Sequence, residues 1–360
     1  MDPSASEPRD ADVQPRPKRR VWGTVGSVAA IVVGVAAVGA GFVHLPYVLI
    51  SPGDATRVEK VVDIEGAPTY HDDGSVLFLT VSVSGARPNV YTVLSGWLDD
   101  DVEVVPEEDI LGGRSRKEDE RLNEIAMTDS QIVATKVGLE RLGYAVPVKE
   151  YVVGAVEKAS PADGQLEVGD AITAIDGVPV TTIPDLGAVV RMRNPGDPVT
   201  LAFTRDGTAS TVTLATRATP EGPNEGQAQV GIFSAPTFDF PIDVKIDTGD
   251  VGGPSAGLAF TLTILDELSP GDLTGGEKVA VTGTIGLDGS VGPIGGVAQK
   301  AVAARQAGAH LFLVPRDEAK EARKHADGMK VSGVADLGDA LSALQRAGGD
   351  PLPSPTVTAA

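Results

Sequence analysis

Two short glycine-rich segments constrain the fold of this chain more than any other feature. Residues 250–257 read Asp-Val-Gly-Gly-Pro-Ser-Ala-Gly, and residues 292–300 read Gly-Pro-Ile-Gly-Gly-Val-Ala-Gln-Lys. Because glycine tolerates positive φ, each segment can turn the backbone sharply before an apolar helix begins. Each segment therefore predicts a turn-to-helix junction that carries one reactive side chain, Ser255 or Lys300.

A serine and a lysine presented in this way can form a hydrolytic site. A serine hydroxyl is a weak nucleophile until a base removes its proton, and a lysine amine is a base only when neutral. Lys300 has apolar sequence neighbours, and an apolar setting lowers a lysine pKa from ~10.4. A helix that begins near Pro254 leaves backbone N–H groups that can stabilise an oxyanion, and the candidate donors belong to Gly253, Ser255 and Ala256.

Composition excludes several other chemistries, although each motif alone is weak. The serine turn could equally be an ordinary connection or a phosphate-binding loop, and a lone lysine on an alanine-rich helix is usually solvated. The chain has no cysteine, four histidines and no His-Glu-x-x-His motif, which argues against thiol nucleophiles and zinc hydrolases. A formal charge of −20 argues against a nucleic-acid partner. We expect no cofactor and no metal, and the chain contains no P-loop motif.

The N-terminal region contains a long apolar segment. Residues 21–50 include no Asp, Glu, Lys or Arg, and about 20 apolar residues suffice to span a bilayer. Basic residues precede this segment and acidic residues follow it, so the positive-inside rule keeps the N-terminus cytoplasmic. We therefore predict a disordered cytoplasmic tail (1–20), a single transmembrane helix (21–47) with Trp22 and Tyr47 at the two interfaces, and extracytoplasmic domains at the cell membrane. A cleaved signal peptide remains an alternative.

Beyond the apolar segment the chain divides into four parts. Residues 51–147 are interpreted as an extracytoplasmic α/β region that serves as a packing scaffold, with a strand at Val76–Val83 and a helix over 124–142. Residues 219–229 are rich in Pro, Gly, Asn, Gln and Glu and predict a linker. Residues 230–347 alternate β and α elements, as in a sheet covered by helices, and residues 348–360 predict a disordered tail.

Residues 148–218 resemble a bacterial PDZ domain. The segments Ser-Pro-Ala, Val-Gly-Asp and Ile-Asp-Gly-Val-Pro-Val occur in the order and at the spacing of that family. The resemblance implies an exposed strand edge beside a helix, where an extended peptide can add as a further strand. A spacer or an oligomer contact is the alternative, and the sequence does not locate the carboxylate-binding loop.

Residues 240–347 resemble the proteolytic domain of the Lon family. The matching segments are Gly-Pro-Ser-Ala-Gly, Val-Thr-Gly-x-Ile, Pro-Ile-Gly-Gly-Val with Lys300, and Ala-Ala-Arg-x-Ala-Gly-Ala. The resemblance implies that Ser255 is the nucleophile, that Lys300 is the general base, and that Thr282 helps to hold the lysine. The chain departs from the ATP-dependent enzymes because it has no ATPase domain, has Gly252 where an Asp is frequent, and lacks the paired histidines before the serine.

Together these parts resemble the PDZ-containing Lon-like proteases of Gram-positive bacteria and actinobacteria. The predicted fold class is an α/β (α+β) multidomain protein with a transmembrane helix, a PDZ-like domain and a Lon-type proteolytic domain. The predicted function is a membrane-anchored, ATP-independent serine endopeptidase with a Ser-Lys dyad and protein or peptide substrates. The resemblance also implies a homo-oligomer, a hexamer. The alternative is an anchored PDZ adaptor whose Lon-like domain is a weak or inactive scaffold.

Overall fold

The computed structural model describes residues 31–32, 34–35, 38–70, 73–182, 185–220 and 224–353. The chain divides into two compact units, one with residues up to Ile50 together with Val83–Gly112, and one with Ser51–Ser82 together with the residues after Gly112. The predicted tail 1–20 and the first part of the predicted transmembrane segment, 21–30, lie outside the described residues. Within the described ranges, no helix combines the length and the apolar character that a bilayer crossing requires.

The first unit is built around a short antiparallel strand pair. The first residues of β1 (Tyr47–Arg57) pair with β4 (Glu103–Pro106). Between them in sequence lies α2 (Val90–Trp97), which begins where the Asn89 side chain accepts a hydrogen bond from the Thr92 N–H at 3.0 Å. Such a cap satisfies one of the free N–H groups of the first turn. The short helix α3 (Glu107–Leu111) follows β4.

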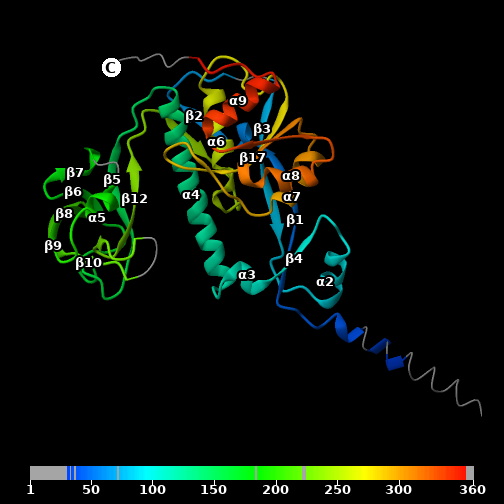
Figure 1. Ribbon diagram of the computed structural model, residues 1–360, viewed down its shortest axis with the longest axis horizontal. Helices are drawn as coiled ribbons and strands as arrows, with labels where there is room; N and C mark the ends of the chain where they lie inside the picture. The colour runs from blue at the N-terminus through cyan, green and yellow to red at the C-terminus, as the bar shows by residue number, and fades with distance from the viewer. Residues whose placement is uncertain are drawn as a thin grey trace, which may run out of the picture. The chain divides into compact units, whose positions relative to one another are not determined.

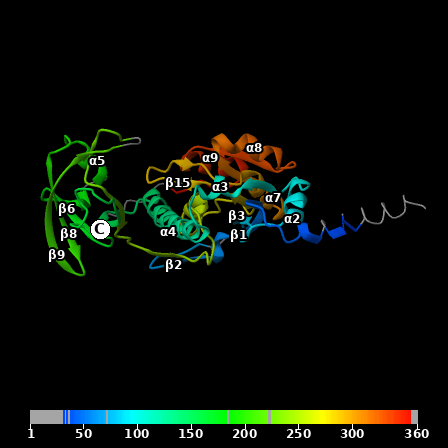
Figure 2. The ribbon, with the colours of Figure 1, turned by 90° about the horizontal axis from the view of Figure 1, so that it is seen from below.

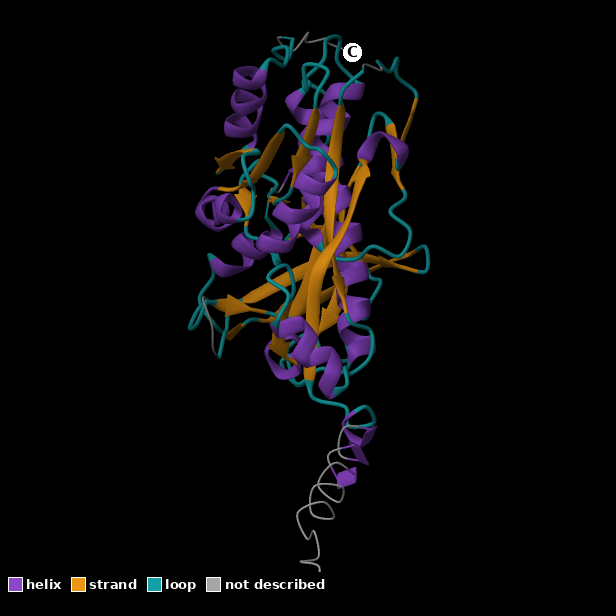
Figure 3. Cartoon of the chain, turned by 90° about the vertical axis from the view of Figure 1, so that its right-hand side faces the viewer, coloured by secondary structure: helices purple, strands orange, loops and turns teal. Residues whose placement is uncertain are grey.

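The second unit contains a largely parallel sheet (Figures 1 and 3). Its strands are ordered β18-β17-β14-β3-β1. β3 (Ser75–Val83) pairs in parallel with β14 (Lys278–Val281), which pairs in turn with β17 (Leu311–Pro315), and β18 (Lys330–Val334) lies beside β17. A parallel sheet is normally buried on both faces, and β17 is buried along its whole length. Residues 75–82 therefore belong to the core of the proteolytic domain and not to a separate scaffold.

A long helix from the same region covers this core. α4 (Arg116–Arg141) starts earlier than the predicted 124–142, because Ser115 caps it by accepting a hydrogen bond from the Glu118 N–H at 3.2 Å. α4 packs against α6 (Gly257–Glu267), the helix that follows Ser255. At Gly138 a Cβ would lie 3.0 Å from the Ile264 side chain, so glycine permits this close approach of the two helices.

The remaining elements after residue 240 alternate between strands and helices, as predicted. Residues 278–285 do not form one continuous strand, because β14 ends before Thr282 and Gly283 and β15 begins only after them. Gly283 has φ 150°, a conformation that favours glycine. The other elements are β2 (Val62–Glu65) paired with β13 (Asp243–Ile246), η1 (Val58–Lys60), η3 (Pro254–Ala256), β15 (Thr284–Ile285) paired with β16 (Val291–Gly292), α7 (Val297–Gln306), η4 (Arg316–Glu318), α8 (Ala319–Lys324) and α9 (Leu337–Ala347).

The residues directly after α9 are tied to the core. The Asp350 N–H donates to the Asp272 carbonyl at 2.8 Å, and Leu352 packs against the main hydrophobic cluster. The predicted disordered tail from Gly348 therefore does not begin there, and residues 354–360 lie outside the described residues. Composition alone could not show these contacts, because they join positions far apart in the sequence.

The PDZ-like part forms its own six-stranded sheet with a separate apolar core (Figure 2). Its order is β12-β5-β6-β8-β9, and β7 pairs with β6. The edge strand β12 (Ile232–Phe238) comes after the predicted linker, so the predicted boundary at residue 218 leaves out one strand of this domain. The other elements are β5 (Val148–Val156), β6 (Ala171–Ile175), β7 (Val178–Pro179), η2 (Val180–Thr182), α5 (Leu186–Arg191), β8 (Pro198–Arg205), β9 (Thr208–Ala215), and the hairpin β10 (Arg217–Ala218) with β11 (Ala228–Gln229).

Candidate active site

Ser255 lies in η3, immediately before α6, where the backbone turns against α4. Gly253 has φ 92°, and its N–H donates to the Asn123 carbonyl at 2.8 Å. At Gly252 a Cβ would lie 3.0 Å from the Cβ of Asn123, so the glycine pair permits a close approach of two backbones. The Ser130 hydroxyl donates to the Pro254 carbonyl at 3.0 Å and ties the turn to α4 a second time. Ser255 itself is half-buried.

Lys300 projects from the first turns of α7 toward the serine. Its Nζ donates to Ser255 Oγ at 2.8 Å and to Thr282 Oγ1 at 3.3 Å. The Thr282 hydroxyl donates in turn to the Ser255 carbonyl at 3.2 Å. The structure thus brings together the three side chains that the sequence singled out.

The turn before α7 depends on a glycine. Gly296 caps the helix with φ 67°, and a Cβ there would lie 2.6 Å from the Val81 side chain. A β-carbon at that distance would require the Val81 side chain of β3 to shift, so glycine lets the start of α7 pack closely against the sheet. Lys300 is 3% exposed, and the next four residues of α7 are buried alanines and a valine.

Burial controls the protonation of Lys300. The loss of solvent around the ammonium lowers the pKa of Lys300 from 10.5 to about 8, and the carboxylate of Glu318 acts in the opposite direction. A pKa near 8 leaves a substantial neutral fraction at ordinary pH, whereas a solvated lysine is almost entirely charged. A neutral Nζ at hydrogen-bond distance can accept the proton of Ser255 Oγ.

Glu318 is a further residue of the site that sequence reasoning did not identify. Its Oε1 accepts a hydrogen bond from the Ile294 N–H at 2.9 Å, in the Pro-Ile-Gly-Gly turn that leads into α7. Its Oε2 is buried and has no hydrogen-bond partner among the described residues. The sequence offered no signal for it, because the position reads as part of an ordinary charged helix.

The predicted oxyanion donors are only partly arranged for that role. The Gly253 N–H is engaged by Asn123 and is not available to a substrate oxygen in this structure. The Ser255 carbonyl is turned toward the strand break, where it accepts from the Gly283 N–H at 2.8 Å. The N–H groups of Ser255 and Ala256 remain the candidate donors at the helix start. Within the described ranges, no group of His, Asp and Glu side chains is arranged to hold a metal ion.

Comparison with known families identifies both domains. Residues 229–344 match the Lon protease (S16) C-terminal proteolytic domain, and residues 117–216 match a PDZ domain. The chain is 36% identical to Lon protease 2 of Bacillus subtilis over 109 residues, which are 30% of this chain and 18% of that protein. It is 38% identical to the Lon protease of Metamycoplasma arthritidis over 93 residues, 24% of this chain and 11% of that protein. The match thus spans less than a fifth of these relatives.

These matches confirm the predicted PDZ and Lon-type proteolytic domains, and with the latter the predicted enzyme class, a serine-type endopeptidase. Among solved structures, the PDZ domain of the SdrC-like protein from Listeria monocytogenes is similar, at 22% identity and a TM-score of 0.23. That similarity covers 25% of this chain and 93% of that domain. β3 and the whole of α4, which complete the core around Ser255, lie outside the Lon-type match.

Proposed function

We propose that the chain is a membrane-anchored, extracytoplasmic serine endopeptidase that uses Ser255 and Lys300 as a dyad and needs no ATP. The observation that carries the proposal is the 2.8 Å hydrogen bond between Lys300 Nζ and Ser255 Oγ in a buried setting. Protein or peptide substrates are proposed from the proteolytic domain. The dyad itself requires neither a metal nor a nucleotide, because the neutral lysine supplies the base.

The chemistry needs one proton acceptor and one nucleophile. Neutral Lys300 Nζ takes the proton of Ser255 Oγ as the oxygen attacks a peptide carbonyl carbon. Backbone N–H groups at the start of α6 stabilise the oxyanion. The ammonium then gives its proton to the leaving amine, which leaves an ester on Ser255. Lys300 next deprotonates a water that hydrolyses the ester, and the proton returns to Ser255 Oγ. Thr282 orients Nζ through its hydroxyl and transfers no proton.

The first test is proteolysis without nucleotide. The purified full chain in detergent should cleave both an unfolded protein and a short peptide, and added ATP with Mg²⁺ should leave both rates unchanged. Cleavage that appears only with ATP would overturn the ATP-independent mode. Absence of any cleavage would favour the second candidate, an anchored PDZ adaptor with an inactive Lon-like scaffold. The engagement of the Gly253 N–H by Asn123 is the observation that favours that candidate.

The anchor is proposed from the sequence. Support comes from the charge-free residues 21–46, which precede β1, and from the basic residues before them, which favour a cytoplasmic N-terminus. Trp22 lies in this segment, so quenching of its fluorescence by lipid tests the anchor. A signal peptide cleaved within the segment would remove Trp22 from the mature protein. A hexamer is proposed by family resemblance alone, and the mass of the detergent-solubilised protein tests it.

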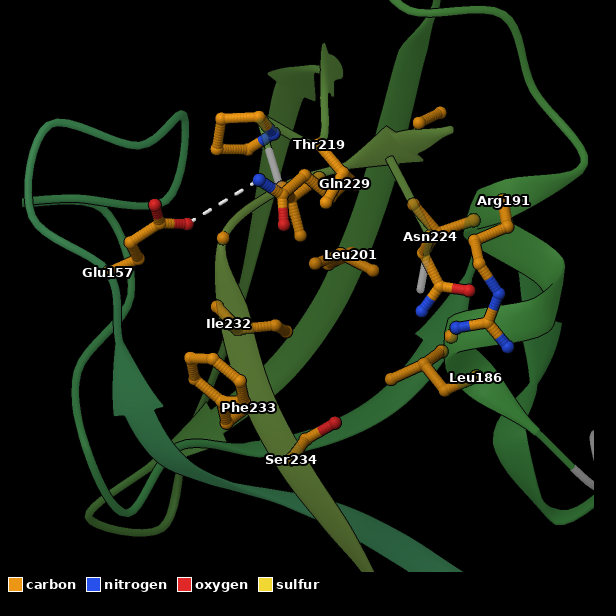
Figure 4. Close-up of a pocket in the computed structure, with 16 residues that line it drawn as sticks. Glu157, Leu186, Arg191, Leu201, Thr219, Asn224, Gln229, Ile232, Phe233 and Ser234 are labelled. Atoms are coloured by element: carbon orange, nitrogen blue, oxygen red, sulfur yellow. Dashed lines mark hydrogen bonds between the residues drawn. The ribbon is translucent and has the colours of Figure 1, made fainter. Parts of the chain in front are cut away.

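The PDZ domain is proposed to bind extended peptide segments of substrates or partners. Support comes from a pocket of about 450 Å³ between α5 and the edge strand β12 (Figure 4). Apolar side chains of Leu186, Val190 and Ile232 line it, and Gly231 with φ 79° precedes the strand. Because β12 is an edge strand, its outer backbone groups are free to pair with a peptide. The sequence did not locate this groove because β12 follows the predicted linker.

Phe233 offers a test that spares the core. It lines the pocket and is 69% exposed, so Phe233→Asp should fold and weaken peptide docking. We expect turnover of a protein substrate to fall several-fold while short-peptide hydrolysis is unchanged. Met192→Asp is the matched control, because Met192 is also highly exposed in the same domain and does not line the pocket. Equal loss on both substrates would contradict a docking role. Deleting 148–218 is a poorer test, because it removes the partner strand of β12.

A further inference from the structure

Helix α2 of the first unit has apolar side chains on its exposed side as well as on its buried side, and its exposed polar residues are Thr92 and Ser95. It contains no charged residue between Val90 and Trp97. Its inner side packs on the strand pair, where Val93 is buried and a Cβ at Gly96 would lie 2.8 Å from Val104. A helix on a protein surface normally presents polar residues on its outer side. Here the outer stripe and the residue that follows the helix are apolar and exposed, namely Tyr91, Leu94, Trp97 and Leu98.

The outer stripe adjoins the end of the apolar N-terminal segment. The Leu45 N–H donates to the Pro88 carbonyl at 2.9 Å, directly before α2. At Gly41 a Cβ would lie 3.6 Å from the Tyr91 ring. Phe42 and Val43 are exposed beside this junction, at 79% and 51%. The exposed apolar stripe therefore lies beside the exposed apolar residues at the end of the segment that we propose as the anchor.

Trp97 is held in place while its ring remains accessible. It contacts Tyr47 edge to face, with ring centroids 6.1 Å apart and planes at 80°. Trp97 is nevertheless 59% exposed. Tryptophan and tyrosine favour the boundary between lipid tails and water, because each joins an apolar ring to a polar N–H or O–H.

We propose that α2 lies on the membrane surface and inserts Tyr91, Leu94, Trp97 and Leu98 into the interfacial layer of the bilayer. The proposal rests on the proposed anchor, which would hold this unit next to the lipid. Interfacial helices of this kind bury one apolar face to a depth of roughly 5–10 Å. The nearby charges are Arg87, which pairs with Glu107 at 2.6 Å, and the acidic run Asp99 to Asp101. They offer no attraction to anionic lipid, so the contact should form on zwitterionic lipid and should be insensitive to salt.

The chain contains two tryptophans, Trp22 in the proposed anchor and Trp97 in α2, so membrane insertion of the anchor and of α2 can be measured separately. Trp22→Phe leaves Trp97 as the only tryptophan, and Trp97→Phe leaves Trp22 in the proposed anchor. Each full-length variant is reconstituted in phosphatidylcholine vesicles whose acyl chains are brominated either near the headgroup or near the chain end. We expect Trp97 to be quenched more strongly by the shallow bromines than by the deep ones, at low and at high salt.

The outcomes are distinct. Quenching of Trp22 without quenching of Trp97 keeps the anchor and overturns the docking of α2. Quenching of neither tryptophan overturns both. If lipid did not quench Trp97, but Trp97 became shielded from water as the protein concentration rose, a second copy would cover the stripe. That result would overturn a lipid partner.

A variant pair completes the test. Leu94→Lys with Leu98→Lys, in the Trp22→Phe background, makes the outer stripe polar and leaves the buried Val93 and Gly96 unchanged. It should reduce Trp97 quenching at least about threefold while hydrolysis of a short peptide is retained. Met192→Lys, an exposed apolar position of the PDZ-like part, should change neither quantity. Undiminished Trp97 quenching in the double-lysine variant would show that the stripe does not hold the helix on lipid.

Discussion

Ser255→Ala should abolish proteolysis. The substitution removes the attacking oxygen, and Ser255 Oγ is the group to which Lys300 Nζ donates at 2.8 Å. We expect kcat/KM to fall by at least about 10³-fold, as when the nucleophile of a serine hydrolase is deleted. The fold should survive, because the side chain is small and half-buried and its carbonyl keeps the hydrogen bonds from Gly283 and Thr282.

The measurement is hydrolysis of a fluorogenic peptide, together with labelling by a serine-reactive phosphonate. Ser342→Ala is the matched control, because Ser342 is exposed on α9 of the same domain. It should retain full activity and full labelling. If purified Ser255→Ala, with unchanged thermal unfolding, still cleaved the peptide, the nucleophile would have to lie elsewhere.

Lys300→Arg should be as inactive as Ser255→Ala. An arginine stays protonated at all working pH values and cannot accept the serine proton. Lys300→Met is the companion variant, because it keeps an unbranched apolar stem in a site where Lys300 is only 3% exposed. It should fold and should also be inactive. Thr282→Val should have a smaller effect, since it removes an orienting hydrogen bond and not the base. Near wild-type activity in Lys300→Arg would rule out the dyad.

The pH dependence of the wild-type enzyme follows from the same residue. The active form has neutral Lys300, whose pKa burial lowers to about 8. Activity should therefore be low below this pH, rise through about 8 and level off above it. Glu318→Gln removes the carboxylate that raises the pKa of Lys300, while its amide oxygen can still accept from the Ile294 N–H. The rising limb should move to lower pH, so that the rate at pH 7 increases roughly two- to fivefold with the plateau unchanged.

Asp317→Asn is the control for the shift, because it removes the neighbouring carboxylate, which is exposed. Its profile should coincide with that of the wild type. If the rising part of the pH–activity profile moved to higher pH in Glu318→Gln, or did not move, Glu318 would act only on the fold of the turn. A lower plateau without a shift would have the same meaning, because loss of position reduces the rate at every pH.

The sequence by itself determined the features that are local in the chain. Ser255 and Lys300 could be found because each lies in a contiguous turn-to-helix segment, in which glycines and a proline fix the backbone. The alternation of strands and helices after residue 240 could be predicted for the same reason, since hydrophobic periodicity and turn residues are local features of the sequence. The PDZ and Lon-type domains could likewise be predicted from short continuous motifs, and both are confirmed.

Only the tertiary structure decided what depends on contacts between distant parts of the chain. β3 enters the sheet beside β14, and α4 covers α6 and engages Gly253 through Asn123, so a region interpreted as a scaffold completes the proteolytic core. β12, which follows the predicted linker in the sequence, adds an edge strand to the PDZ-like sheet. The lowered pKa of Lys300 and the role of Glu318 arise from burial and from charge across space. None of these leaves a periodic or contiguous pattern, because a pairing partner or a buried neighbour can come from any distance along the sequence.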